Sequence, residues 1–167
     1  RFVLGRTSKI SSKKYTQDPT IMAWEVANEP RPMRPAANDA YVKWLAVTTA
    51  AIKSIDKNHL VTLGHEGWIG TEDIKLFETV HADANVDYLT IHIWPKNWGW
   101  IENGKMAAGF TTAVEKTEKY IDDNAAVAVK LNKPLVIEEF GLPRDGPSFD
   151  VSSTTELRDQ YFSKILS

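Results

Sequence analysis

The stretch Ile21-Met22-Ala23-Trp24-Glu25-Val26-Ala27-Asn28-Glu29-Pro30 is an apolar run that ends with an amide and a carboxylate side by side. A second stretch, Pro134-Leu135-Val136-Ile137-Glu138-Glu139-Phe140-Gly141, is again apolar and ends in carboxylates. Short apolar runs bounded by Pro and Gly are typical of buried strands. Two such strands predict carboxylates gathered at one end of a parallel sheet, where α/β enzymes place their chemistry.

Two further strand patterns lie between these stretches, and apolar residues at helical spacing follow each strand. One of these helices is expected to start at the capping box Thr112–Glu115. Parallel neighbours need right-handed crossovers of about this length. The pattern therefore predicts four β-α units whose strands are parallel and adjacent, near residues 21–27, 60–64, 87–93 and 134–139.

Two α/β architectures fit this order of elements. A doubly wound sheet would normally carry a Gly-rich phosphate turn, and no G-x-G-x-x-G or G-K-[ST] motif is present. A (β/α)₈ barrel needs eight units and roughly 250 residues. We therefore predict a partial (β/α)₈ TIM barrel in which residues 1–167 are a single domain, the central half of a barrel that is incomplete at both ends. A doubly wound binding domain remains the alternative.

Composition excludes several classes of protein. The chain has 167 residues, 43% of them hydrophobic and 25% charged, which is typical of a globular domain. Its 20 basic and 22 acidic residues form no long basic run, so a nucleic-acid partner is not expected. Without cysteine, disulfides and thiolate metal sites are excluded. No apolar run approaches the ~20 residues of a membrane span.

Three motifs in this order and spacing, Trp24–Arg31, Ile91–Pro95 and Glu138–Gly141, resemble the glycoside hydrolases of family 5, and most closely their endo-β-1,4-mannanase branch. The resemblance covers essentially the whole chain. It implies that Glu29 is the acid/base at the end of the fourth barrel strand and Glu139 the nucleophile at the end of the seventh. It further implies a β-mannan polysaccharide as substrate, a monomer when complete, and a secreted or periplasmic location. The fragment alone is expected to be inactive.

The chemistry of glycoside cleavage explains why two carboxyl groups are needed. One protonates the leaving oxygen while the other attacks the anomeric carbon, and a separation of about 5 to 5.5 Å gives retention of configuration. By resemblance, Asn28 would bind the sugar 2-hydroxyl and His92 would orient a carboxylate or a sugar hydroxyl. The reaction needs no cofactor, and the scattered histidines show no metal-ligand spacing, so no metal is expected. For His59, His65 and His81 a structural role is preferred.

Two positions on the acid-ending strands are ambiguous. Side chains alternate along a strand, so only one of Glu138 and Glu139 is expected to face the barrel interior, and the family pattern alone selects Glu139. The family generally places a Tyr two residues after the equivalent of His92, where its hydroxyl touches the nucleophile, and this chain has Trp94 there. An indole N–H donates but cannot accept, so that contact is expected to change.

The remaining candidates bind substrate. Trp94 and Trp98 lie in a Trp-rich loop and are expected to include a platform on which sugars stack. Arg31 and Glu66 follow the first two strands and complete the substrate-binding set. Two alternative functions remain open on these residues. One is a β-1,4-glucanase of the same family, which would share both glutamates, and the other is a non-catalytic carbohydrate-binding remnant.

Overall fold

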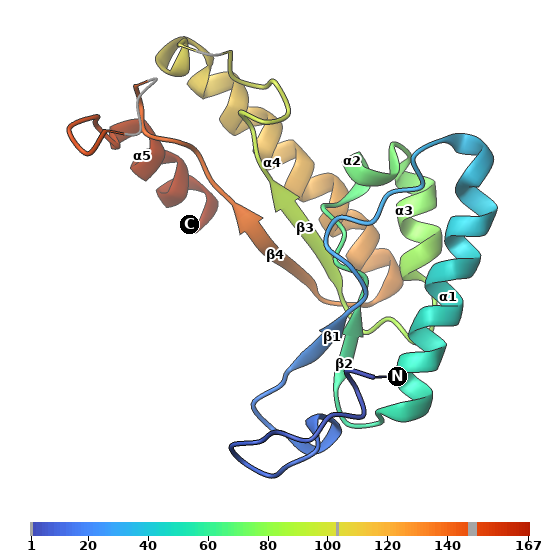
Figure 1. Cartoon of the computed structure of the whole chain (residues 1–167). Coiled ribbons are helices and arrows are strands. Elements are labelled where there is room, and N and C mark those ends of the chain that lie inside the picture. Colours follow the sequence, from blue (N-terminus) through green and yellow to red (C-terminus); the bar gives the residue numbers. More distant parts are fainter. Residues whose placement is uncertain (1, 103, 147–149) are drawn as a thin grey trace. The chain divides into compact units, whose positions relative to one another are not determined.

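The computed structural model describes residues 2–102, 104–146 and 150–167 (Figure 1). By internal contacts the chain divides into two compact units. Unit 1 comprises Arg1–Ile91 with Val127–Val136, and unit 2 comprises His92–Ala126 with Ile137–Ser167. In the described part of the chain, no helix has both the length and the apolar character that a membrane crossing requires. Every candidate site residue lies in a described range.

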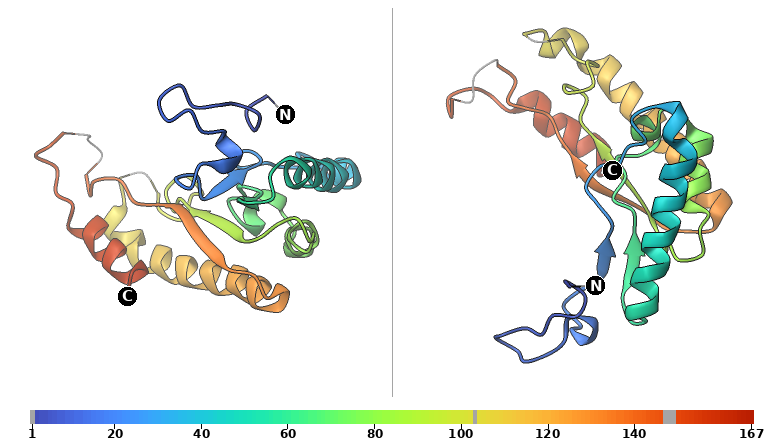
Figure 2. Two further views of the ribbon diagram at one scale, coloured as in Figure 1. Left: turned by 90° about the horizontal axis from the view of Figure 1, so that it is seen from below. Right: turned by 45° about the vertical axis from the view of Figure 1, so that its right-hand side comes forward.

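Unit 1 begins with a short 3-10 helix, η1 (Tyr15–Gln17), followed by the parallel strands β1 (Ala23–Glu25) and β2 (Leu60–Thr62). Trp24 pairs with Val61 in this register, and the pairing continues past both strands, because the N–H of Ala27 donates to Leu63 O at 3.4 Å. In both views of Figure 2, the two strands lie between the segment that precedes β1 and the helix α1 (Asn38–Ile55).

The strand β3 (Leu89–Ile93) follows β2 but does not form a regular ladder with it. Instead, the hydroxyl of Thr62 donates to the carbonyl of Tyr88 at 3.0 Å, and the hydroxyl of Thr90 donates to the carbonyl of His65 at 3.0 Å. Between β2 and the residues that lead into β3, the N–H of Asp87 also donates to Val61 O at 2.8 Å. The predicted adjacency of these strands therefore rests on threonine side chains together with a main-chain bond.

The strands β3 and β4 (Leu135–Phe140) form the second pair. Leu89 N–H donates to Pro134 O at 2.9 Å, and Gly141 N–H donates to Ile93 O at 3.2 Å. Residue numbers rise together along both strands, so the pair is parallel, as predicted. All residues of β3 are buried.

The helices follow the predicted order with two differences. A short helix, α2 (Trp68–Thr71), which was not among the predicted elements, precedes α3 (Ile74–His81). The helix α4 (Met106–Leu131) begins before the expected capping box, so Thr112 lies inside it. Burial explains the earlier start, because Met106 packs in a core cluster with Ile101. The remaining helices are η2 (Pro35–Ala37) and α5 (Glu156–Ile165).

Each unit has its own hydrophobic core. In unit 1, α1 packs against β2 and α3 and buries a cluster composed of Tyr41, Leu45, Leu63, Leu76, Val80 and Val86. In unit 2, α4 and α5 share a cluster composed of Ile101, Met106, Ala113, Val114, Leu142 and Tyr161. Apolar residues spaced three or four apart on these helices, such as Tyr41 and Leu45, therefore face a core, as the periodicity predicted. Trp44 and Ile55 share the helical spacing of α1 but are exposed.

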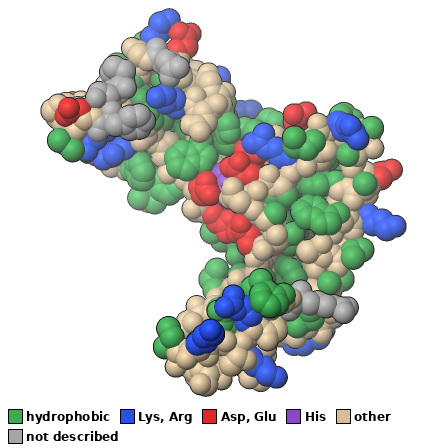
Figure 3. Space-filling view, viewed as in Figure 1, with side chains coloured by type: hydrophobic (Ala, Val, Ile, Leu, Met, Phe, Trp, Pro, Cys, Tyr) green, Lys and Arg blue, Asp and Glu red, His purple; other side chains and the backbone are tan. Residues whose placement is uncertain are grey.

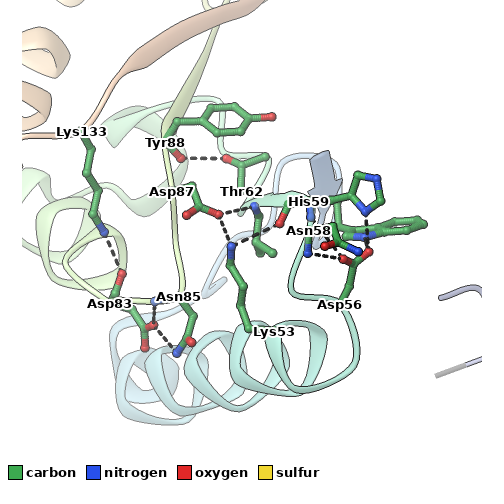
Figure 4. Close-up of polar contacts among 12 residues, drawn as sticks. Lys53, Asp56, Asn58, His59, Thr62, Asp83, Asn85, Asp87, Tyr88 and Lys133 are labelled. Atoms are coloured by element: carbon green, nitrogen blue, oxygen red, sulfur yellow. Dashed lines mark hydrogen bonds and ion pairs between the residues drawn. The ribbon is translucent and has the colours of Figure 1, made fainter. Parts of the chain in front are cut away.

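A polar network lies at the end of α1 and the start of β2 (Figure 4). Its centre is the carboxylate of Asp56, which is 1% exposed and accepts hydrogen bonds from the Trp24 indole at 2.7 Å and from Asn58 N–H at 2.8 Å. The ring of His59 lies 2.6 Å from the same carboxylate. Burial raises the pKa of Asp56, but these hydrogen bonds outweigh it and lower the pKa to about 2.

We expect this network to make stability depend on acid. Because the folded pKa of Asp56 is depressed from 3.8 to about 2, its contribution is present above about pH 4 and is lost as the pH falls toward 2. The contribution is roughly 2 kcal/mol. Asp56→Asn should lose this contribution to stability at pH 6, as measured by urea denaturation of the complete protein in which this chain occurs. The stability of the variant should also depend less on acid than that of the wild type.

The control is Asp123→Asn, because Asp123 pairs with the exposed Lys119 one helical turn away. An exposed pair of this kind contributes less than about 0.5 kcal/mol. Equal loss of stability in Asp56→Asn and the control would contradict the role assigned to the network. Burial lowers the pKa of His59, but its contacts with the Asp56 carboxylate and with Asp18 together outweigh burial and raise that pKa. The contribution of His59 to stability is therefore present below about pH 6.5, and it is lost as the pH rises through the pKa of His59 in the folded protein.

Candidate active site

Glu29 lies in unit 1, just after β1, in a tightly held turn. Its N–H donates to Gly64 O at 2.8 Å, so the parallel pairing with the segment after β2 continues up to this residue. Its φ is +47°, in the left-handed region, and the next residue is Pro30. A residue before proline prefers extended backbone, so this conformation is strained by about 1 to 3 kcal/mol. Such strain persists only where the surrounding structure fixes the backbone.

Gly64 permits the close approach of the two chain segments. A Cβ atom at this position would lie 2.0 Å from the carbonyl oxygen of Ala27, and the φ of Gly64 is +78°. Both observations require glycine here. The backbone that carries Asn28 and Glu29 therefore rests directly on the end of β2.

We expect Gly64→Ala to destabilise the protein by roughly 3 kcal/mol, since it combines a left-handed alanine with a clash against backbone. It should also lower the glycoside hydrolase activity expected from the family resemblance, because Ala27 is next to Asn28 and Glu29. Gly99→Ala is the matched control: Gly99 has φ +70° but nothing within 4 Å of the added Cβ. Denaturation midpoints and activity of both variants test the prediction. If the two variants lose equal stability, the destabilisation comes from the left-handed φ alone, and the argument from the clash with Ala27 is wrong.

Arg31 joins Glu29 to a second carboxylate. Its guanidinium is paired with Glu66 and lies 3.8 Å from Glu29. The Glu66 side chain is 1% exposed, whereas that of Arg31 is 45% exposed. Gly70 lies against Glu66, because an added Cβ would meet its Oε1 at 2.8 Å. A cavity of about 340 Å³ borders Arg31 on this side and is lined by Pro32, Met33, Arg34, Pro35, Asn38, Gly70, Thr71, Glu72 and Asp73.

Unit 2 brings together His92 and Trp94 at the end of β3 with both glutamates of β4. The indole N–H of Trp94 donates to Glu139 Oε2 at 3.0 Å, and His92 Nδ1 lies 3.4 Å from the same oxygen. Glu138 Oε2 lies 3.7 Å from the other nitrogen of His92. His92 therefore lies between two carboxylates, and Glu139 has the additional indole donor.

The position of Trp94 depends on Gly141. An added Cβ on Gly141 would lie 3.2 Å from the Trp94 ring, so the glycine that follows Glu139 and Phe140 leaves room for the indole. The sequence predicted that the contact made by a tyrosine in the family would change. In this chain the indole donates to the carboxylate directly.

The other candidates occupy different surroundings. Trp98 packs edge-on against Trp100 and Tyr120, with ring centroids 5.0 and 5.2 Å apart. This aromatic cluster in unit 2 is a different set of contacts from the one around Glu139. Asn28 is exposed beside Glu29.

Two buried residues near the Glu29 turn were not among the predicted site residues. The hydroxyl of Tyr41 donates to the carbonyl of Pro30 at 2.7 Å and contacts His65 Nε2. Tyr41 matched the apolar spacing of its helix, and His65 was assigned a structural role. No signal in the sequence indicated that they meet.

Comparison with known proteins identifies the family. The model of the family described as GH family 5 beta-mannosidase-like matches residues 1–167. Mannan endo-1,4-beta-mannosidase 4 of Solanum lycopersicum is 33% identical over 175 residues, which cover 99% of this chain and 41% of that protein. Putative mannan endo-1,4-beta-mannosidase 9 of Oryza sativa subsp. japonica is 35% identical and is covered to 40% of its length. The chain thus spans about two fifths of the curated relatives it matches.

Solved structures agree with the predicted fold class. The glycoside hydrolase family 5 mannosidase from Rhizomucor miehei matches with a TM-score of 0.85 and 32% identity over 97% of this chain and 38% of that one. A mutant of that protein was solved in complex with mannosyl-fructose. The endo-1,4-beta-D-mannanase from Thermotoga petrophila matches with a TM-score of 0.78 and 26% identity, covering 99% of this chain and 48% of that one. The fold is a partial (β/α)₈ barrel, and the chain belongs to the β-mannosidase-like proteins of glycoside hydrolase family 5.

Proposed function

We propose that the complete protein is a retaining, endo-acting glycoside hydrolase that cleaves β-1,4-mannosidic linkages. One observation carries the proposal: Glu139 accepts a hydrogen bond from Trp94 and lies against His92, while its side chain stays 39% exposed. A nucleophile needs a fixed direction and open access to the substrate, and this arrangement supplies both. The names of the relatives support mannan as the substrate class.

Glu139 would attack the anomeric carbon in the first step. The bond from the anomeric carbon to the leaving oxygen breaks as the bond to the Glu139 carboxylate forms, which gives a covalent glycosyl-enzyme. The hydrogen bond from Trp94 fixes one oxygen of the carboxylate, so the other is directed to the sugar. His92 supports the same orientation from its Nδ1 side.

Glu29 would donate a proton to the leaving oxygen and then, as a base, take one from the water that releases the sugar. Asn28 would bind the sugar 2-hydroxyl from the neighbouring position. The left-handed turn and the hydrogen bond to Gly64 support this role, because they define the direction in which Glu29 leaves the backbone. A separation of about 5 to 5.5 Å between the two carboxyl groups stays a prediction.

We propose that the cavity beside Arg31 receives part of the polysaccharide. Carbohydrate sites combine apolar surface with a few placed polar groups, and this cavity offers Arg31, Arg34 and Asn38 beside Met33. The buried Glu66 would hold the guanidinium of Arg31 in place toward the substrate. Trp94 and Trp98 are the proposed aromatic contacts. Secretion or periplasmic export and a monomeric state are proposed on the family resemblance.

We also propose that this chain is the central half of one catalytic barrel domain. Apolar residues next to or within the outermost strands are open to solvent, with Met22 66% and Val136 36% exposed. Figure 3 likewise shows hydrophobic side chains at many points of one face. Residues of a closed barrel would cover such positions. The coverage of about two fifths of the relatives is consistent with this proposal.

Hydrolysis assays on galactomannan, glucomannan and carboxymethyl-cellulose test the function in the complete protein. The proposal expects oligosaccharides of mixed length from both mannans and little from carboxymethyl-cellulose. Preference for carboxymethyl-cellulose would identify a β-1,4-glucanase instead. Mannan binding with no product after prolonged incubation would identify a carbohydrate-binding protein and overturn the proposal.

A further inference from the structure

The peptide that follows Glu29 is held by a contact from a residue outside the proposed catalytic and substrate-binding set. Tyr41 of α1 donates its hydroxyl hydrogen to the carbonyl oxygen of Pro30 at 2.7 Å. The hydroxyl also contacts Nε2 of His65. A phenol has one hydrogen to donate, and Pro30 takes it, so His65 must donate its Nε2 hydrogen to the phenol oxygen. The network thus assigns the tautomer of His65.

The histidine is itself fixed on several sides within unit 1. Its carbonyl accepts the hydrogen bond from Thr90, and its ring packs edge-on against Phe77 and His81 at 5.9 and 4.8 Å. Tyr41 meets the same ring edge-on at 6.0 Å. Contacts from α3 and β3 therefore fix His65, and His65 contacts the Tyr41 hydroxyl that holds the carbonyl of Pro30.

The held carbonyl is next to the strained residue. Glu29 has φ +47° before a proline, and its own N–H is bound by Gly64 O at 2.8 Å. Gly64 thus fixes the backbone before Glu29, and Tyr41 fixes it after. Tyr41 is 6% exposed and His65 fully buried, so neither can touch a polysaccharide. Burial raises the pKa of the Tyr41 hydroxyl, which remains a donor at any working pH.

We propose that Tyr41 and His65 are positioning residues that hold Glu29 in the direction from which it transfers its proton. This inference rests on the proposed function, because it assumes that Glu29 is the acid/base. It assigns a role to a buried pair that would otherwise be read as core packing.

The test uses Tyr41→Phe in the complete protein, which keeps the ring and removes the hydroxyl. A misdirected acid slows a reaction whose leaving group needs a proton, and we expect kcat on mannan to fall about tenfold to a hundredfold with KM nearly unchanged. On a dinitrophenyl β-mannoside, the first step should be nearly normal and the second slow. Azide, which needs no base, should restore the second step and give β-mannosyl azide.

Tyr161→Phe is the matched control. Tyr161 is also fully buried, and its hydroxyl lies 3.1 Å from that of Thr117 in unit 2. This variant loses a buried hydroxyl contact, and any change in its kinetics should depend neither on the leaving group nor on added azide. Equal losses on mannan and on the dinitrophenyl substrate in Tyr41→Phe, with no azide effect, would overturn the inference. Unchanged kinetics would overturn it as well.

A pair of changes at His65 keeps the test decisive if Tyr41→Phe does not fold. His65→Leu removes the donor and should reproduce the azide-restored defect. His65→Gln keeps an N–H donor and should recover most of the activity; equal activity in the two variants would count against the inference. Glu29→Ala, assayed in parallel, separates the two levels of argument. If it shows no dependence on leaving group, the proposed function fails. If Glu29→Ala shows this dependence on the leaving group and the Tyr41 and His65 variants do not, only the positioning role fails.

Discussion

Replacing Glu139 with Ala is expected to lower kcat/KM on every substrate by about 10⁴-fold or more, because it removes the proposed nucleophile. The loss should be independent of the leaving group. Added azide can enter the space left by the carboxylate and attack in its place. One displacement inverts the configuration, so the product from a β-mannoside should be the α-mannosyl azide, identified by NMR.

Glu138→Ala is the control for this experiment. Glu138 also approaches His92, at 3.7 Å, but lacks the indole donor that Glu139 has. It should keep most of the activity and give no azide product. If the α-azide came from Glu138→Ala and not from Glu139→Ala, the choice between the adjacent glutamates would be wrong.

Replacing Glu29 with Ala should have an effect that depends on the leaving group. On mannan, we expect a loss of about 10² to 10⁴-fold, because the leaving oxygen needs a proton. A dinitrophenolate leaves without one, so the covalent intermediate should form and then hydrolyse slowly for want of a base. Azide should release it as the β-mannosyl azide with retained configuration.

Burst kinetics on the dinitrophenyl substrate would measure the two steps of the Glu29 variant separately. Equal losses on mannan and on the activated substrate would show that Glu29 is not the proton donor. The contrast with Glu139→Ala gives the sharpest reading, because the two variants should give azides of opposite configuration.

The sequence predicted the strands and the residues at the strand ends because those features are local. An apolar run that stops at Asn28 and Glu29, or at Glu139, marks the end of a buried strand. The predicted start of α4 was wrong. The capping motif at Thr112 is a local signal, whereas the observed start at Met106 depends on the burial of Met106 beside Ile101, which is tertiary packing. Tertiary contacts routinely override local signals.

The contact between β2 and β3 shows a second limit. A strand pattern at residues 87–93 predicts a neighbour for β2. It cannot specify that threonine hydroxyls supplement a single main-chain bond there in place of a regular ladder, since the outcome depends on how the two backbones diverge. The contact between Tyr41 and His65 could not be predicted for the same reason, because it depends on tertiary structure. They lie 24 positions apart, and their meeting depends on the angle at which α1 crosses the end of β2.

The contact between Trp94 and Glu139 has a consequence for the covalent intermediate of the proposed mechanism. Once one oxygen of Glu139 is bonded to the sugar, the other becomes the carbonyl oxygen of an ester. The indole N–H, which now donates to Oε2, would then donate to that carbonyl without turning. Because an indole cannot accept a hydrogen bond, it has no second arrangement in which it reverses direction. The anion and the ester would thus be held by the same unchanged bond, and glycosylation of Glu139 would require no reorganisation at Trp94.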